Sequence, residues 1–283
     1  MLDARGVLEV ERLIRSVAAT EIMPRFGQLA AADIVEKTGP DNLVTVADRA
    51  AESALTAGLT AILPGSVVVG EEAVADDPGV LDALVGDAPA WIVDPIDGTY
   101  NYATNNPRFT VLVALAHRGS LLASWTLAPA LDMFATAVAG QGAHLDGRPL
   151  RVGSAPDDLR HLDVTAPQQK WWTPAQREQF NAMCAHAVSL GFYDTTGLEY
   201  VTLAAGRRTA MILTWDFPWD HAAGALLVAE AGGVMIGGDG TPYRPSAGNP
   251  LPMIAAPVAA SVARLHAALR GERPPASSRA GDG

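Results

Sequence analysis

The feature that most constrains the fold is an apolar segment that runs directly into a short acidic turn. Residues 90–93 read Ala-Trp-Ile-Val, and residues 94–99 continue as Asp-Pro-Ile-Asp-Gly-Thr. The apolar run is typical of a buried strand. Because Pro95 cannot donate a ladder hydrogen bond and Gly98 tolerates backbone angles that other residues avoid, we expect the chain to turn sharply here. The turn would bring two carboxylates, a hydroxyl and several backbone N–H groups to one strand end.

Two carboxylates held at the end of a buried strand repel each other and resist ionisation. A hard divalent cation would remove that conflict, because such ions prefer oxygen ligands. The backbone N–H groups of the turn could then receive an anion such as phosphate. Taken alone, Asp94 and Asp97 are equally compatible with an Asx-type turn that binds nothing.

Two other acidic segments stand at the ends of expected elements. The apolar run 67–70 leads into Glu71 and Glu72, and Asp220 opens a run of small residues that is typical of a packed helix. Individually, the glutamates fit a solvated loop and Asp220 fits a helix N-cap. Together with the turn at 94–99 they predict one site, because proteins that mix helices and strands assemble their sites at strand ends.

Composition narrows the class of protein. The chain has 283 residues, of which 49% are hydrophobic and 18% charged, and this predicts a globular protein with a large core. The net charge of −11 argues against a nucleic-acid partner, which would require clustered basic residues. The single cysteine suits a reducing compartment, and neither a signal peptide nor a membrane span is expected. We therefore predict a cytoplasmic protein without a membrane partner.

The alternation of helical and strand patterns predicts mixed α and β structure in two lobes. We expect an N-terminal lobe over residues 1–152 that carries most of the acidic residues, a C-terminal lobe over 153–270, and a disordered tail over 271–283. Among the helices, one is expected from Val46 to Ile62, and a capping box at Thr173 predicts another that runs to Gly191.

The acidic segments also give the chain a family resemblance. Four segments carry it, in this order along the chain: Gly70-Glu71-Glu72, Asp94 to Thr99, Trp219-Asp220 and Glu230-Ala231-Gly232-Gly233. This ordered set is similar to that of the inositol monophosphatase family of magnesium-dependent, lithium-sensitive phosphatases, over about Val7 to Leu269. The resemblance implies an α+β fold, layered as the α-β-α-β-α sandwich of sugar phosphatases, and a homodimer.

The resemblance implies a site as well. It assigns two or three Mg²⁺ ions to oxygen ligands from Glu71, Asp94, the Ile96 carbonyl, Asp97 and Asp220. Glu72 would support these ligands from behind, and Lys37 would lie on a loop above the metals, although a solvated lysine fits Lys37 nearly as well. The residues implied in catalysis are Asp48, Thr99 and Glu71. Those implied in substrate binding are Gly98, Thr99, Glu199 and Asp220.

The pair Thr99 and Asp48 would orient the attacking water, whereas Asp48 alone would fit a charge that favours a helix start. Inositol-specific members carry a glutamate seven residues before the aspartate of Trp-Asp, and here that position is Leu213. We therefore expect little selectivity for inositol, with Glu199 or Asp216 contacting the leaving group instead. Trp171 and Trp172 are expected to pack in the core or at a dimer interface rather than to line a rim.

The predicted function is Mg²⁺-dependent hydrolysis of a small phosphomonoester, a polyol or sugar phosphate, by metal-activated water. Phosphoryl transfer needs mainly charge neutralisation and positioning, so no covalent intermediate is expected. The alternatives left open are a phosphatase of the same fold that acts on histidinol phosphate or fructose 1,6-bisphosphate, and a catalytically silent binding protein. The intact acidic set argues against the silent protein.

Overall fold

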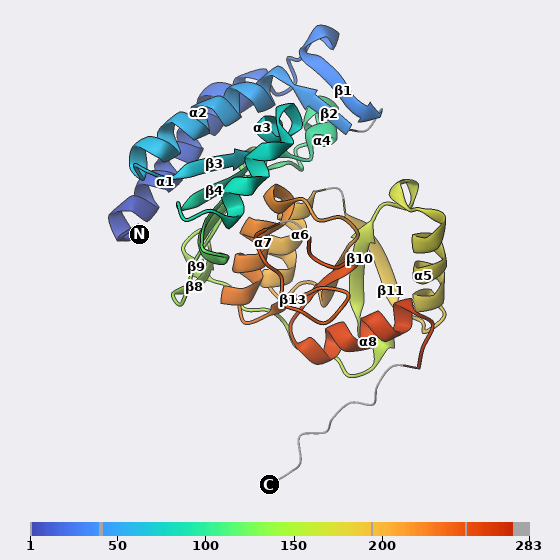
Figure 1. Ribbon diagram of the computed structural model, residues 1–283. Helices are drawn as coiled ribbons and strands as arrows, with labels where there is room; N and C mark the ends of the chain where they lie inside the picture. Colours follow the sequence, from blue (N-terminus) through green and yellow to red (C-terminus); the bar gives the residue numbers. More distant parts are fainter. Residues whose placement is uncertain (1, 40–41, 194, 247, 274–283) are drawn as a thin grey trace.

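Two β-sheets divide the helices of the chain into layers, as the computed structural model shows (Figure 1). The structure describes residues 2–39, 42–193, 195–246 and 248–273. A seven-stranded sheet has the order β3-β4-β5-β6-β7-β8-β9, and a five-stranded sheet has the order β11-β10-β12-β14-β13. A separate hairpin of β1 (Ile34–Gly39) and β2 (Asn42–Thr45) stands beside the first sheet.

The elements have the following bounds. The seven-stranded sheet contains β3 (Val67–Gly70), β4 (Ala90–Asp97), β5 (Thr110–His117), β6 (Ser120–Ala128), β7 (Met133–Val138), β8 (Gly142–Leu145) and β9 (Arg148–Pro149). The five-stranded sheet contains β10 (Asp163–Pro167), β11 (Ser189–Tyr193), β12 (Ala210–Leu213), β13 (Val234–Ile236) and β14 (Met253–Ala256). The α-helices are α1 (Ala4–Val17), α2 (Val46–Ile62), α3 (Glu71–Asp76), α4 (Thr99–Ala103), α5 (Pro174–Cys184), α6 (Thr196–Ala204), α7 (Pro218–Glu230) and α8 (Ala259–Leu269).

The layers follow from the alternation of side chains along the strands. In β4, Trp91 and Val93 pack in the core formed with α1 and α2, whereas Ile92 packs on the opposite face with α7. Helices α6 and α7 lie between the two sheets, and α5 and α8 cover the outer face of the five-stranded sheet (Figure 1). The order helix, sheet, helix, sheet, helix confirms the predicted α-β-α-β-α sandwich of an α+β fold.

Local sequence signals correctly predict the start of α2 but not the end of α5. Helix α2 covers the predicted residues and begins at the N-cap Thr45, whose hydroxyl accepts a hydrogen bond from the Ala47 N–H. The helix predicted from Thr173 to Gly191 ends instead at Cys184. Its expected last turn belongs to β11, which pairs in parallel with β10, so pairing within the sheet overrides the local helical pattern.

The two sheets lie on opposite sides of residue 152 in the sequence, since the first ends at Pro149 and the second begins at Asp163. The division into lobes at 152/153 nevertheless stays a prediction. Most of the predicted tail, from residue 274 onward, lies outside the described residues. In the described ranges, no helix combines the length and apolar character needed to cross a bilayer.

Candidate active site

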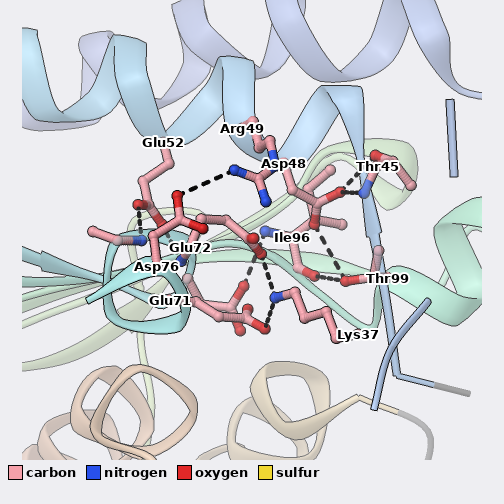
Figure 2. Close-up of polar contacts among 12 residues, drawn as sticks. Lys37, Thr45, Asp48, Arg49, Glu52, Glu71, Glu72, Asp76, Ile96 and Thr99 are labelled. Atoms are coloured by element: carbon pink, nitrogen blue, oxygen red, sulfur yellow. Dashed lines mark hydrogen bonds and ion pairs between the residues drawn. The ribbon is translucent and has the colours of Figure 1, made fainter. Parts of the chain in front are cut away.

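The acidic ends of several elements meet at one cleft of about 1040 Å³. They come from the starts of α3 and α7 and from the junction of β4 with α4, and the hairpin adds Lys37. Eight of the predicted site residues line this cleft: Lys37, Glu71, Asp94, Ile96, Asp97, Gly98, Thr99 and Asp220. Asp48 and Glu72 lie just behind the lining and contact it through Thr99 and Lys37, respectively (Figure 2).

The end of β4 places Asp94 and Asp97 differently from the sharp turn that the sequence predicts at Pro95. The strand runs on to Asp97, and its pairing with β5 shifts register between Asp94 and Asp97. The chain turns only at Gly98, whose φ of +87° lies in the left-handed region. A Cβ atom there would also come within 2.4 Å of Thr195 Cγ2, so conformation and space both require glycine.

Asp97 connects the seven-stranded sheet to the start of helix α6. Its Oδ2 accepts hydrogen bonds from Thr110 Oγ1 and from the Gly197 N–H, each at 2.7 Å, and its Oδ1 accepts one from the Thr196 N–H at 3.2 Å. The N–H donors belong to the first turn of α6, so the carboxylate satisfies groups that a helix start leaves unpaired. Burial raises the pKa of Asp97, although these hydrogen bonds work against the rise.

Asp48 and Thr99 form the pair that the resemblance implies. Thr99 Oγ1 lies 3.2 Å from Asp48 Oδ1 and 3.0 Å from the Ile96 carbonyl oxygen (Figure 2). The other oxygen of Asp48 accepts a hydrogen bond of 2.8 Å from the Thr45 N–H in a capping box. Burial raises the pKa of Asp48 to about 7, against the lowering effect of the Thr45 hydrogen bonds. The residue therefore both caps α2 and contacts Thr99.

Lys37 points into the acidic site rather than into solvent. Its Nζ lies 2.9 Å from Glu71 Oε1 and 2.6 Å from Glu72 Oε1 (Figure 2). Burial alone would lower the pKa of Lys37, but the charges of Glu71 and Glu72 outweigh burial and raise it. The reading of Lys37 as a solvated side chain is therefore wrong.

Asp94 is buried, Asp220 is partly buried, and the two face the same acidic neighbours. Burial raises the pKa of each, and the charge of Glu71 raises both further. The charge of Asp97 acts in the same direction on both. Asp220 lies in the first turn of α7 and accepts a hydrogen bond from the Trp215 indole. Among the described residues no ion pair reaches Asp94, Asp97 or Asp220.

The donor set fits a hard cation such as Mg²⁺, because it consists of carboxylate oxygens and one backbone carbonyl in a buried, negatively charged cleft. The Oε2 atom of Glu72 is buried and has no hydrogen-bond partner among the residues that the structure describes. Within the described ranges, however, no three Asp, Glu, His or Cys side chains already form a ready-made metal site. The chemistry of the donors fits the ion, and their side chains have to adjust to hold it.

Three predicted contributors to selectivity lie outside the lining of the cleft. Leu213, which stands where the family resemblance implies a glutamate, is fully buried in the core between the sheets. Its side chain therefore cannot contact a substrate in the cleft. Glu199 is buried against Arg208, with Glu199 Oε1 2.8 Å from Arg208 Nε. Asp216 accepts hydrogen bonds from the N–H groups of Gly248 and Asn249.

Trp171 and Trp172, for which we expected the same environment, lie in different ones. Trp172 is buried and stacks on Phe180 with 4.2 Å between the ring centroids, as the expectation of core packing requires. Trp171 lines the cleft and is 52% exposed, so the rim that we set aside is its actual position.

Sequence reasoning also missed residues that hold the site in place. Glu52 accepts hydrogen bonds from the N–H groups of Glu72 and Ala73, at 2.9 and 2.8 Å, and so fixes the start of α3. A Cβ atom on Gly70 would meet the Glu52 carboxylate carbon at 2.3 Å, which explains the glycine. One signal could have found Glu52: it follows Asp48 by four residues and thus shares its helix face.

Comparison with known proteins places this arrangement in a family. A model of the inositol monophosphatase family matches residues 3–273. An inositol monophosphatase of Dictyostelium discoideum is 31% identical over 210 residues, which are 71% of this chain and 74% of that protein. The Nus factor SuhB of Pseudomonas aeruginosa is 33% identical over 220 residues, 74% of this chain and 78% of that protein.

Solved structures agree with the fold. An IMPase from Thermotoga maritima superposes with a TM-score of 0.77 at 24% identity, covering 95% of this chain and 97% of the other. A Staphylococcal IMPase-II with bound inositol monophosphate has a TM-score of 0.73 at 23% identity, over 93% and 92% of the two chains. From the family match across almost its whole length, the chain belongs to the inositol monophosphatase family, whose members are phosphoric monoester hydrolases.

Proposed function

We propose that this enzyme hydrolyses a small phosphomonoester with Mg²⁺ as its cofactor, releasing inorganic phosphate and an alcohol. The observation that carries the proposal is the convergence of the buried Asp94 and Asp97 with the partly buried Asp220 in one cleft, without a described ion pair. Uncompensated buried carboxylates cost several kcal/mol each. A bound divalent cation would remove that cost and supply the positive charge that a phosphate ester requires.

The residues that would hold two or three Mg²⁺ ions are Glu71, Asp94, Asp97, Asp220 and the Ile96 carbonyl. Bound there, the ions would neutralise phosphate charge and lower the pKa of a water molecule. Asp97 would offer Oδ1, because two hydrogen bonds already occupy Oδ2. Glu71 would have to exchange its contact with Lys37 for the metal. Lys37 would still hold Glu72 in place behind the ligands.

Thr99 and Asp48 would together accept the proton of the attacking water. With Asp48 ionised, Thr99 donates its hydroxyl proton to Asp48, which leaves the Thr99 oxygen free to accept a hydrogen bond from water. As the water oxygen bonds to phosphorus, the ester P–O bond breaks, and the departing alkoxide takes a proton from solvent and leaves as the alcohol. The proton of the attacking water passes to Thr99, and the Thr99 proton passes to Asp48. A pKa of about 7 suits a base that works near neutral pH.

The backbone N–H groups of Gly98 and Thr99 would hold the phosphate, as the resemblance implies. Several relatives carry names that state inositol monophosphate as their substrate, which supports a small phosphate ester of an alcohol as the substrate of this chain. Contact of Glu199 with the leaving group would require it to leave Arg208. The homodimer, lithium sensitivity and cytoplasmic location stay predictions of the resemblance.

A phosphate-release assay tests the proposal. The purified protein should release phosphate from glycerol 2-phosphate in the presence of Mg²⁺, lose this activity in EDTA, and regain it when Mg²⁺ is restored. Undiminished turnover in EDTA would contradict the role of the metal. Failure to release phosphate from any of a broad panel of phosphomonoesters would favour a catalytically silent protein.

A further inference from the structure

Aromatic rings form the outer part of the cleft. Three of them are partly exposed although they are large and apolar: Tyr100 is 44% exposed, and Trp171 and Phe217 are each 52% exposed. Exposed aromatic residues that gather in one concave place mark a binding site more often than chance, because each ring carries a large apolar area. These three residues are hereafter the aromatic wall.

The aromatic wall adjoins the proposed catalytic residues directly. Tyr100 follows Thr99 in the chain, and Phe217 precedes Asp220 by one turn of helix. Phe217 also stacks on Trp219, with 5.1 Å between the centroids and 6° between the ring planes, so its orientation is fixed. A group attached to a phosphate at the acidic end of the cleft would therefore extend along these rings.

A shared contact links two rings from different parts of the fold. The Lys170 ammonium lies 5.0 Å from the Tyr100 ring centroid and 5.2 Å from that of Trp171. Tyr100 belongs to α4, which connects β4 and β5 of the seven-stranded sheet, whereas Trp171 ends a short 3₁₀ turn after β10 of the five-stranded sheet. The aromatic wall is thus a built surface, assembled from both halves of the chain, and not a single stray ring.

The two carboxylates that we expected to contact the leaving group are engaged elsewhere. Glu199 Oε1 accepts hydrogen bonds of 2.8 Å from both Thr165 and Arg208, and both oxygens of Asp216 accept hydrogen bonds from Asn249 or Gly248. Neither of these two carboxylates is among the described residues that line the cleft. Besides its rings, the outer cleft offers the Lys170 ammonium and neutral polar groups, including Thr173, Gln176 and Thr214.

We propose that the alcohol released by this phosphatase carries a flat aromatic ring that binds against the aromatic wall. The preferred substrate class is therefore an arylalkyl phosphate, not a polyol phosphate. The inference rests on the proposed phosphatase function and adds the substrate class to it. Each contact with such a ring face raises the affinity for an aromatic group by roughly three- to tenfold. The hydroxyl groups of a polyol would instead lose bound water without gaining Glu199 or Asp216 as hydrogen-bond partners.

Benzyl phosphate and cyclohexylmethyl phosphate provide a matched test, because they differ in the flat π-face of the ring and both release a primary alcohol. We expect kcat/KM for benzyl phosphate to exceed that for cyclohexylmethyl phosphate, and that for inositol 1-phosphate, by about tenfold, mainly through KM. The variants Trp171→Ala and Phe217→Ala should bring the benzyl-to-cyclohexylmethyl ratio toward one, and Trp171→Phe should restore it. Phe192→Ala is the control, because Phe192 is 45% exposed and is absent from the described lining of the cleft.

A binding measurement separates this inference from the proposed function. Benzylphosphonate, which cannot be hydrolysed, should bind the wild-type protein about three- to tenfold more tightly than Trp171→Ala, whether or not any ester is turned over. If glycerol 2-phosphate is hydrolysed but the benzyl and cyclohexylmethyl esters are equivalent, or inositol 1-phosphate is preferred, the aromatic proposal is overturned while the phosphatase function stands. A change of oligomeric state in Trp171→Ala or Phe217→Ala, with the substrate ratio unchanged, would assign the wall to contact between copies and also overturn it.

Discussion

Two groups of carboxylates, each with buried members, differ in their charged neighbours. In the C-terminal half, Arg208 lies between the buried Glu199 and the half-exposed Asp163, with Arg208 nitrogens at 2.8 and 2.6 Å from their oxygens. In the cleft, Asp94 and Asp97 are buried, Asp220 is partly buried, and no described ion pair reaches any of the three. In the first group, which we call the arginine cluster, a side chain of the protein balances the acidic charge. In the second group, the cleft carboxylates, the described side chains leave that charge unbalanced, and this difference supports our proposal that the cleft binds a cation.

The largest effect should come from removing a cleft carboxylate. Asp94→Asn should lower kcat/KM for a phosphomonoester by at least roughly 10³-fold, because it removes a proposed metal ligand at the centre of the group. The same change should raise the stability of the metal-free protein, since it deletes a buried charge that its neighbours repel. Activity assays and thermal unfolding in EDTA measure the two effects. Full activity in the variant would remove Asp94 from the mechanism.

Breaking the arginine cluster should lower stability and leave activity nearly unchanged. Arg208→Met leaves Glu199 buried without its cation and should cost about 3 kcal/mol of unfolding free energy while kcat stays near wild type. Denaturant titration and steady-state kinetics check this expectation. The double variant Glu199→Gln/Arg208→Met should recover part of the lost stability. A large rise in KM for Glu199→Gln would instead support the predicted contact of Glu199 with the leaving group.

A smaller loss of activity is expected from changes at Thr99 and at Asp48, which caps α2 as well as contacting Thr99. Thr99→Ala and Asp48→Asn should each lower kcat by about 10²-fold, and the double variant should be little worse than either, because the two residues pass one proton as a unit. Mg²⁺ affinity, measured by calorimetry, should change much less. Losses that multiply in the double variant would mean that the residues act independently.

The same contrast explains what the sequence could and could not predict. The cleft carboxylates sit at element ends, where local signals such as the apolar run before Asp94 and the N-cap before α2 fix their position. Their convergence was therefore foreseeable from pattern and family resemblance. Even there, the chain turns at Gly98 and not at Pro95, because pairing of β4 with β5 continues to Asp97.

Selectivity was harder to predict, because it depends on which side chains meet across the fold. Leu213 occupies the position at which the family resemblance implies a substrate-contacting glutamate, yet its strand turns it into the core. Glu199 accepts a hydrogen bond from Arg208, nine residues later in the chain, and does not line the cleft. A single sequence gives no sign of that contact. Trp171 and Trp172 are adjacent and chemically identical, and only the packing of Trp172 on Phe180 separates the buried ring from the exposed one.

The buried carboxyl groups of the cleft, which we propose to bind a cation, should make the stability of the metal-free protein depend on pH. Burial raises the pKa of Asp48 to about 7 in the folded protein, above the ordinary aspartate value of 3.8. Between these two pH values the folded state holds a proton that the unfolded state releases, so stability is highest at the acid end and falls as the pH rises through 7. Asp94, Asp97 and Asp220 shift in the same direction.

The most direct test is calorimetric unfolding of the wild-type protein and Asp94→Asn at about pH 5 and about pH 8, with and without Mg²⁺. Comparison with the variant removes the pH effects of all other groups. Without Mg²⁺, the stability of the wild type should fall more than that of Asp94→Asn between pH 5 and pH 8. Added Mg²⁺ should raise the stability of the wild type but not that of the variant, and the rise should be largest at pH 8. Equal pH dependence in the two proteins, with no stabilisation of the wild type by Mg²⁺, would contradict the account.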